Sequence, residues 1–307
     1  MESSLIYAGI EAGGTKFVCL VGSDPDRVFA EARFETSDPQ ITLANSAAFI
    51  KTQAEKLPIS ALGIASFGPL DLDQNSPTYG YITTTPKPGW SNTNILGVIK
   101  DALELPAVID TDVNAAALAE YIWGGAGQYD PLLYLTIGTG IGGGIIVDGK
   151  PLHGAVHPEM GHLRIPHDPE TDPFPGICPY HSDCLEGLAT GPALQKRWGV
   201  PAELLPDDHP AWELEAYYIA LAVVNLILSF SPRRVVLGGG VMGRQRLFPL
   251  IRRQVQGLLA GYLQSALILE HIDELIVAPA LGDRSGVLGA IALAMQHTHI
   301  QATIPGN

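Results

Sequence analysis

The feature that most constrains the fold of this 307-residue chain is a two-strand pattern that occurs twice. Residues 5–21 read LIYAGIEAGGTKFVCLV, and residues 131–149 read PLLYLTIGTGIGGGIIVDG. In both, two apolar runs flank a turn rich in Gly and Thr, which is typical of a β-hairpin. The repeat therefore predicts two related domains that face each other across a ligand-binding cleft.

Strand-like and helical segments alternate between the hairpins and after the second one, as in α/β proteins. Short apolar runs predict strands at residues 59–66, 107–110, 234–237 and 274–278. Longer segments predict helices at residues 43–57, 94–103, 216–230, 247–262 and 286–297. We expect a smaller N-terminal domain at residues 1–118 and a larger one at 119–307, with the C-terminal helix, about 286–307, packed back on the first domain.

Composition and charge argue against several classes of protein. The net charge of −14, without a run of Lys or Arg, disfavours binding to nucleic acid. The most apolar long segment, 216–230, is shorter than the about 20 residues of a membrane span, so we expect a buried helix and no membrane partner. The N-terminus MESSLIYAG lacks the basic and apolar regions of a signal peptide, which predicts a cytoplasmic protein.

Three glycine-rich turns follow apolar strands, at residues 13–16 (GGTK), 136–144 (TIGTGIGGG) and 238–242 (GGGVM). Glycines let backbone N–H groups approach an anion, while Thr15, Thr139 and Lys16 add hydroxyl groups and positive charge. Each turn alone is also explained as a tight hairpin turn or a flexible loop. Together the three turns predict a nucleotide site split between two domains.

Two acids open the alanine-rich helix that follows the strand at 107–110, in the order Asp110-Thr111-Asp112-Val113-Asn114. A carboxylate at this place can simply cap the helix, because free N–H groups and the helix dipole stabilise its charge. One cap needs only one acid, however. The spare carboxylate, for which Asp112 is the candidate, can accept a proton from a substrate hydroxyl.

Two of the three cysteines lie close together as Cys178-x-x-His181-x-x-Cys184, and His162 lies upstream of them. A disulfide is disfavoured in the reducing cytoplasm, and Cys19 would be left over. Two thiolates and two imidazoles suit tetrahedral Zn²⁺ and leave no open position, so this metal would be structural. As fourth ligand, His162 has three rivals nearby, His153, His157 and His167.

Two glutamates, Glu159 and Glu186, lie on either side of the proposed zinc site in the sequence. A loop clamped by a metal would hold both carboxylates rigidly, and carboxylates accept hydrogen bonds from sugar hydroxyls. Each glutamate alone is equally compatible with an exposed, solubilising role.

The whole set of motifs resembles the ROK family of sugar kinases, and within it the bacterial fructokinase branch. The resemblance covers nearly the whole chain. It is carried by GIEAGGTKF, SFGPLDLD, YGYITTTPKPGW, DTDVNAAALAE, TIGTGIGGG, HPEMGHLRI, CPYHSDCLEG, ATGPAL, VVLGGGVM and LGDRSGVLGA. It implies a two-domain, actin-like (ribonuclease H-like) α/β fold that closes on ATP and a hexose.

At matching positions the resemblance also implies residue roles. Asp112 matches the general base, and Thr111, Asp112, Glu159, His162 and Glu186 match residues around the sugar. His162 doubles as a zinc ligand beside Cys178, His181 and Cys184. ATP contacts are implied for Gly13, Gly14, Thr15, Lys16, Thr139, Pro192, Gly238, Gly239, Gly240, Val241 and Met242. Glu11 stands where an Mg²⁺ contact, direct or through water, is expected.

The chain departs from the pattern of most ROK glucokinases, which have Asn at position 111 and Asp at position 11, where this chain has Thr111 and Glu11. The Cys-x-x-His-x-x-Cys spacing also replaces the commoner Cys-x-Cys. These differences favour fructose over glucose, with EC 2.7.1.4 fructokinase as the expected activity. Mannose, glucose or an N-acetylated amino sugar as substrate, and a non-catalytic sugar-binding regulator, remain alternatives.

The family also contains transcription repressors, which carry a helix-turn-helix domain before the first hairpin. Here the hairpin begins near residue 5 and the chain is acidic, which argues against that function. The resemblance further implies a homodimer.

Overall fold

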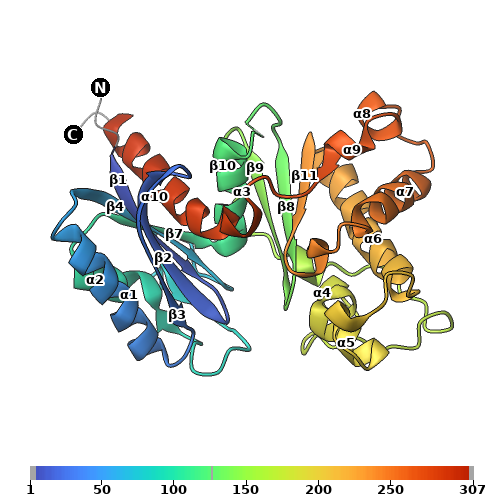
Figure 1. Cartoon of the computed structure of the whole chain (residues 1–307), viewed down its shortest axis with the longest axis horizontal. Coiled ribbons are helices and arrows are strands. Elements are labelled where there is room, and N and C mark those ends of the chain that lie inside the picture. The colour runs from blue at the N-terminus through green and yellow to red at the C-terminus, as the bar shows by residue number, and fades with distance from the viewer. Residues whose placement is uncertain (1–4, 126, 304–307) are drawn as a thin grey trace. The chain divides into compact units, whose positions relative to one another are not determined.

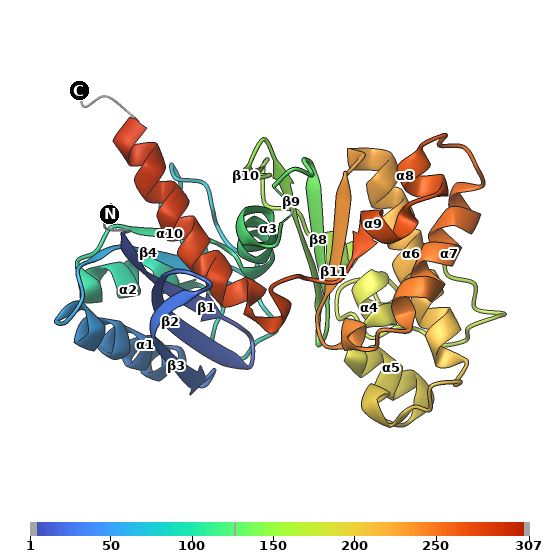
Figure 2. The same cartoon turned by 45° about the horizontal axis from the view of Figure 1, so that its top comes forward.

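The computed structural model describes residues 5–125 and 127–303. Contacts divide the chain into two compact units, shown in Figures 1 and 2. Unit 1 comprises Met1–Gly127, Gly149–His157 and Asp283–Asn307, and unit 2 comprises Gln128–Asp148 and Pro158–Gly282. The division expected at residue 118 falls inside helix α3 (Asp112–Trp123), which belongs wholly to unit 1 because it packs against α10 (Ser285–Thr303).

Unit 1 is built on a five-stranded sheet of order β3-β2-β1-β4-β7. The strands are β1 (Ile6–Ala12), β2 (Lys16–Asp24), β3 (Arg27–Glu35), β4 (Ile59–Ser66) and β7 (Ala107–Thr111). Strands β1, β2 and β3 form antiparallel pairs, whereas β1, β4 and β7 run parallel. The carboxyl ends of β1, β4 and β7 therefore lie along one edge, where ligands bind in open α/β sheets.

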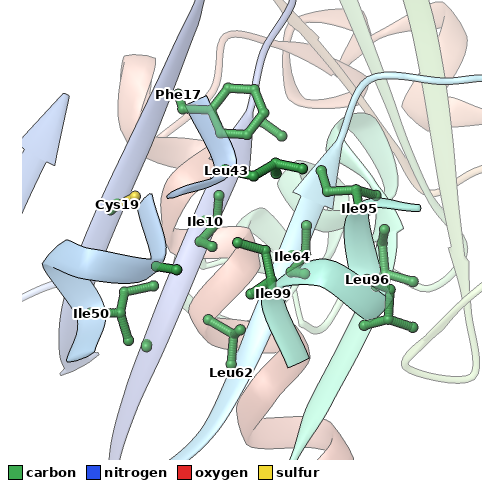
Figure 3. Close-up of a cluster of buried hydrophobic side chains, with 14 of the residues drawn as sticks. Ile10, Phe17, Cys19, Leu43, Ile50, Leu62, Ile64, Ile95, Leu96 and Ile99 are labelled. Atoms are coloured by element: carbon green, nitrogen blue, oxygen red, sulfur yellow. The ribbon is translucent and has the colours of Figure 1, made fainter. Parts of the chain in front are cut away.

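Helices α1 (Pro39–Ala54) and α2 (Ile95–Leu103) cover one face of this sheet (Figure 2). Figure 3 shows the apolar side chains that the two helices and the sheet contribute to the core between them. Ile10, Leu62 and Ile99 are fully buried there. Burial of this apolar surface stabilises the unit. Cys19 lies in the same core, which accounts for the third cysteine without a metal or a disulfide.

Helices α10 and α3 cover the opposite face. Two glycines permit the close approach: a Cβ at Gly63 would overlap the backbone of Ala290, and a Cβ at Gly289 would overlap the backbone of Ala115. Helix α10 thus packs closely against both the sheet and α3. The short strands β5 (Tyr81–Ile82), β6 (Thr93–Asn94) and β10 (Lys150–Pro151) also belong to this unit.

Unit 2 contains the strands β8 (Leu132–Ile137), β9 (Ile141–Val147), β11 (Arg234–Gly238) and β12 (Ile276–Val277) in the order β9-β8-β11-β12. Its hairpin β8–β9 is antiparallel and its other pairs are parallel, as in the β2-β1-β4-β7 part of unit 1. The repeated sequence pattern thus corresponds to repeated strand order. The strand expected at 274–278 is only two residues long, because α9 (Ile272–Leu275) occupies its first half.

The helices of unit 2 are α4 (Leu185–Ala189), α5 (Gly191–Trp198), α6 (Ala211–Phe230), α7 (Leu247–Leu259), α8 (Ala266–Leu269) and α9. Short 3₁₀ turns lie at η1 (Met160–His162), η2 (Ala202–Leu204) and η3 (Val241–Gly243), and η4 (Gly282–Arg284) precedes α10. Within the described residues, α6 alone is long and apolar enough to cross a membrane. Most of its apolar window is buried, which agrees with the core helix expected there.

Candidate active site and metal centre

The two acids that open α3 have different surroundings. Asp110, the next-to-last residue of β7, is buried. Its Oδ1 accepts the backbone N–H of Thr111 at 2.7 Å and the side-chain amide of Asn114 at 2.8 Å, and its Oδ2 lies 2.9 Å from His153 Nε2. Asp110 therefore anchors the start of the helix and the segment that carries His153.

Thr111 is the N-cap of α3, and its Oγ accepts the N–H of Asn114 at 3.1 Å. Asp112 is the first residue of the helix, and its side chain accepts only the neighbouring N–H of Val113, at 2.9 Å, among the hydrogen bonds of the described residues. Asp110 and Thr111 thus supply the structural contacts, and Asp112 is the spare carboxylate. Burial raises the pKa of Asp112 to about 6 although the N–H of Val113 opposes this shift.

Glu11 lies near the end of β1, on the same sheet edge as Asp112. Burial, and then the negative charge of Asp112, raises the pKa of Glu11 to about 7, while Lys16 and Arg33 oppose the shift. Gly286 at the start of α10 is also close, because a Cβ there would overlap the Glu11 carboxylate. A cation bound here would favour the ionised forms of both acids.

The turn between β1 and β2 consists of Gly13, Gly14 and Thr15, and Lys16 is the first residue of β2. The Gly13 N–H bonds the carbonyl of Lys16 at 3.0 Å, and the Thr36 hydroxyl donates to the Gly13 carbonyl at 2.7 Å. Gly14, Thr15 and Lys16 are exposed. The turn is therefore fixed at its base and open at its tip.

Unit 2 contains a pocket of about 1020 Å³. Three of its lining glycines come from separate segments: Gly138 from the β8–β9 turn, Gly191 from the start of α5 and Gly240 from the loop after β11. The Gly191 N–H bonds the Gly138 carbonyl at 2.8 Å. Gly239, between β11 and Gly240, has a φ of +90°, which strongly favours glycine.

Of the residues expected to contact a nucleotide in this unit, Thr139, Pro192, Gly239, Gly240 and Val241 line the pocket. Gly238 and Met242 do not. Gly238 packs against Tyr134 and Pro279, and the Met242 side chain is buried. These two residues support the turn from behind.

The pocket also has a polar wall that sequence reasoning missed. Arg244 lies over the Trp212 ring at 4.4 Å and pairs with Asp207. Gln195, Glu203, Gln245 and Arg246 are further lining residues. The signal available in the sequence was GRQR at 243–246, which brings two arginines directly after a glycine-rich turn.

The four expected metal ligands come together in unit 2, with their ligand atoms within 4.8 Å of one another. His162 Nδ1 lies 3.8 Å from Cys178 Sγ and 3.6 Å from Cys184 Sγ, and His181 Nδ1 lies 3.7 Å from Cys178 Sγ. With Zn–S about 2.3 Å and Zn–N about 2.1 Å, a tetrahedral site separates such atoms by about 3.6 Å. The set could hold a metal ion.

The three rival histidines lie elsewhere. His153 pairs with Asp110, His157 Nε2 accepts the N–H of Leu70 at 3.0 Å, and His167 Nε2 lies 3.0 Å from the carbonyl oxygen of Asp172. None of them belongs to the His/Cys group found among the described residues. His162 is therefore the fourth member of the group.

The two glutamates of interest lie close in sequence to this group. Glu159 precedes η1, which carries His162, and is exposed. Glu186 is the second residue of α4, whose N-cap is Cys184, and its Oε2 accepts the N–H of Ile141 at 3.0 Å. A metal held by Cys184 and His162 would fix both short helical segments.

Residues 7–297 match the ROK family. The chain belongs to this family. It is 45% identical to the fructokinase of Zymomonas mobilis, with 94% of this chain and 96% of the relative covered. It is 42% identical to the fructokinase of Lactococcus lactis, with 95% and 97% covered. The ROK hexokinase of Thermus thermophilus matches with a TM-score of 0.78 at 26% identity, covering 96% of this chain and 100% of that structure.

The expected ROK fold is confirmed. Structures of ROK proteins match nearly the whole chain, and two α/β units of equivalent strand order are the two halves of the actin-like sugar kinase fold. The expected likeness to the fructokinase branch is confirmed as well, because several relatives at 41–45% identity bear that name.

Proposed function

We propose that this ROK protein catalyses the ATP-dependent phosphorylation of D-fructose to D-fructose 6-phosphate. The observation that carries the proposal is the similarity to relatives named fructokinases, at 41–45% identity over nearly the full length of both chains. Because the similarity covers both units, it includes the regions that carry the acids, the pocket and the His/Cys group.

In the proposed reaction, the primary hydroxyl oxygen of fructose attacks the γ-phosphorus of ATP, and the bond from this phosphorus to the β,γ-bridging oxygen breaks to release ADP. Asp112 accepts the hydroxyl proton. Its freedom from structural hydrogen bonds beyond the N–H of Val113 supports this role. A pKa of about 6 keeps it mostly ionised near pH 7, yet basic enough to accept the proton.

The pocket of unit 2 is the proposed ATP site. Its glycines leave backbone groups accessible to phosphate, and Arg244 and Arg246 bring positive charge to the wall. The Gly13–Lys16 turn of unit 1 is proposed to face the terminal phosphates. Mg²⁺ bound with ATP would neutralise developing charge, and the raised pKa of Glu11 fits a carboxylate that ionises fully beside a cation.

The His/Cys group is the proposed Zn²⁺ site. Two thiolates and two imidazole Nδ1 atoms complete a tetrahedron and leave no position for water, so the ion would stabilise the fold without entering the reaction. It would hold His162, Glu159 and Glu186, which with Thr111 we propose to bind sugar hydroxyls. The cytoplasmic location and the homodimer stay predictions.

The test is ADP release by the purified protein with Mg²⁺-ATP across fructose, mannose, glucose, N-acetylglucosamine and N-acetylmannosamine, with a sugar-free control. We expect the highest kcat/KM for fructose. If another sugar gives the highest value, the kinase activity stands and the fructose assignment is wrong. If no sugar releases ADP above the control, the proposed activity is wrong.

A further inference from the structure

A buried polar cluster lies in unit 2, outside the residues assigned above. We call it the Asp172 cluster, and its members are His167, Asp172, Arg197 and Tyr218. The Tyr218 hydroxyl donates to Asp172 Oδ2 at 2.6 Å, and Arg197 Nη2 lies 3.2 Å from the same oxygen. The side chains of Asp172 and Arg197 are each only 5% exposed.

The cluster joins two helices to the segment from His162 to Cys184, which carries the four proposed metal ligands and which we call the metal loop. Asp172 lies in the segment between His162 and Cys178, whereas Arg197 belongs to α5 and Tyr218 to α6. The Arg197 guanidinium also lies 4.4 Å from the centre of the Phe174 ring, in the same segment. Arg197 Nη1 donates to the carbonyl of Leu188 in α4 at 3.0 Å, so one side chain connects the loop, α4 and α5.

A chain of contacts continues from the cluster to a metal ligand. His167 Nδ1 lies 3.5 Å from Asp183, and Asp183 pairs with Arg164 at 2.7 Å. Arg164 donates to the carbonyl oxygen of His181 at 2.7 Å. Every link from His181 to Arg197 therefore lies within unit 2.

The two helices held by the cluster also form the nucleotide pocket. Pro192 and Gln195 of α5 and Trp212 of α6 are lining residues. Because α5 has only eight residues, we expect a displacement of Arg197 near its end to be transmitted to Gly191 at its start, which lines the pocket. The geometry thus connects the metal loop to one wall of the pocket.

The charges of the cluster leave Asp172 as the counter-ion of Arg197. Glu215 of α6 is also fully buried and close to Arg197, but burial raises its pKa well above the usual range, although Arg197 opposes this shift, and so favours its neutral form. Removing Asp172 would leave the arginine charge buried without a partner, which is strongly destabilising. The pair is therefore sensitive to any displacement of the loop that carries Asp172.

We propose that Asp172 and Arg197 are positioning residues that couple occupancy of the metal centre to nucleotide binding. The proposal rests on the proposed function, since it takes the pocket as the ATP site and the His/Cys group as the Zn²⁺ site. Coupling between two sites is reciprocal. Metal therefore strengthens nucleotide binding, and nucleotide strengthens metal binding.

The experiment uses Tyr218→Phe, which keeps the ring and removes the hydroxyl that bonds Asp172, and Arg197→Lys, which keeps the charge and loses the planar group. Nucleotide affinity is measured by calorimetry with a non-hydrolysable ATP analogue, and zinc affinity is measured by equilibrium competition with a chromogenic chelator. In the wild-type protein we expect zinc removal to weaken analogue binding about fivefold or more, and the analogue to raise the zinc affinity by the same factor.

In both variants, still loaded with one zinc per chain and folded by circular dichroism, we expect analogue binding to weaken and the effect of the analogue on zinc affinity to disappear. The matched control is Arg253→Lys. Arg253 lies in α7 and forms an exposed ion pair with Glu213 of α6, the helix that carries Tyr218. This control should behave as the wild type.

Three outcomes would count against these ideas in different ways. If the wild-type protein binds no analogue or no zinc, the proposed function fails. If it binds both, but neither ligand affects the other, the coupling is wrong. If coupling persists unchanged in folded Tyr218→Phe and Arg197→Lys, coupling exists but the Asp172 cluster does not carry it, and our assignment is overturned.

Discussion

The sheets of the two units share a strand order but differ in the side chains at the ends of their parallel strands. In unit 1 this edge carries acids, Glu11, Asp110 and Asp112. In unit 2 the equivalent region carries glycines and then two arginines, Arg244 and Arg246. A duplicated framework has thus diverged through the loops after its strands, where function concentrates in α/β folds.

The difference assigns separate tasks to the two units. The pKa of Asp112 is raised to about 6 and that of Glu11 to about 7, which suits proton acceptance and cation binding. The glycines and cations of unit 2 suit a polyphosphate. Substitution of the catalytic acid at the edge of unit 1 should therefore lower kcat and leave the affinity for nucleotide unchanged.

The largest expected effect is that of Asp112→Asn. An amide cannot accept the proton of the sugar hydroxyl, so we expect kcat to fall by at least about 100-fold. The affinity for a non-hydrolysable ATP analogue, for which we propose the pocket of unit 2 as the main binding site, should stay unchanged. Steady-state kinetics and calorimetry on the same sample test both statements.

The matched control for this substitution is Asp101→Asn, an exposed acid on α2. It should keep wild-type kcat. Nearly intact turnover in Asp112→Asn would mean that another group accepts the proton. A large loss of analogue affinity would mean that the tasks of the two units are not separate.

The second effect concerns unit 2 and stability. Cys184→Ser removes a thiolate ligand, so we expect loss of stoichiometric zinc and a fall in Tm of about 5 °C or more, since bound ligand stabilises by mass action. Prolonged chelation of the wild-type protein should give the same change. Elemental analysis and thermal melting measure these quantities.

Cys19→Ala serves as the control, because Cys19 is buried in the core of unit 1 and belongs to no metal group of the described residues. It should keep its zinc. An unchanged Tm in a wild-type sample proved to be metal-free would argue against a structural zinc.

How much of the fold and the site could be predicted from the sequence depends on how far apart in the chain the contacting residues lie. The hairpins, the helix after Asp112 and the His/Cys spacing are local patterns, and the structure contains them all. The strand β3 was not expected, although RVFAEARFE alternates between polar and apolar residues at every position except Phe29 and its burial alternates in the same way. Its place comes from pairing with β2.

The parts of the site that were missed depend on contacts between distant segments. Arg244 reaches Asp207, and Asp172 meets Arg197 and Tyr218, across loops whose path no local pattern specifies. The spare carboxylate is the intermediate case. The sequence indicated that one of two acids was surplus, and the side-chain hydrogen bonds show that Asp110 is the engaged one.

The smallest expected effect is a pH dependence of stability that belongs to unit 1. The ordinary pKa of Glu11 is 4.5, and in the folded protein it is about 7. Between these values the folded state holds the proton that the unfolded chain has released, so the free energy of unfolding falls as pH rises from about 4.5 to about 7 and then levels off. Glu11→Gln removes this group, so Tm should depend less steeply on pH over that range. We expect the fall in Tm across the range to be smaller than in the wild type by about 3 °C.

Glu55→Gln, an exposed acid of α1's C-cap, is the control and should keep the wild-type slope. Asp112→Asn gives a second check, because the charge of Asp112 contributes to the raised pKa of Glu11. That variant should also have a shallower slope. If Glu11→Gln melts with the wild-type dependence on pH, Glu11 is ionised throughout this range. Its pKa is then not raised, and this difference between the edge of unit 1 and the edge of unit 2 is wrong.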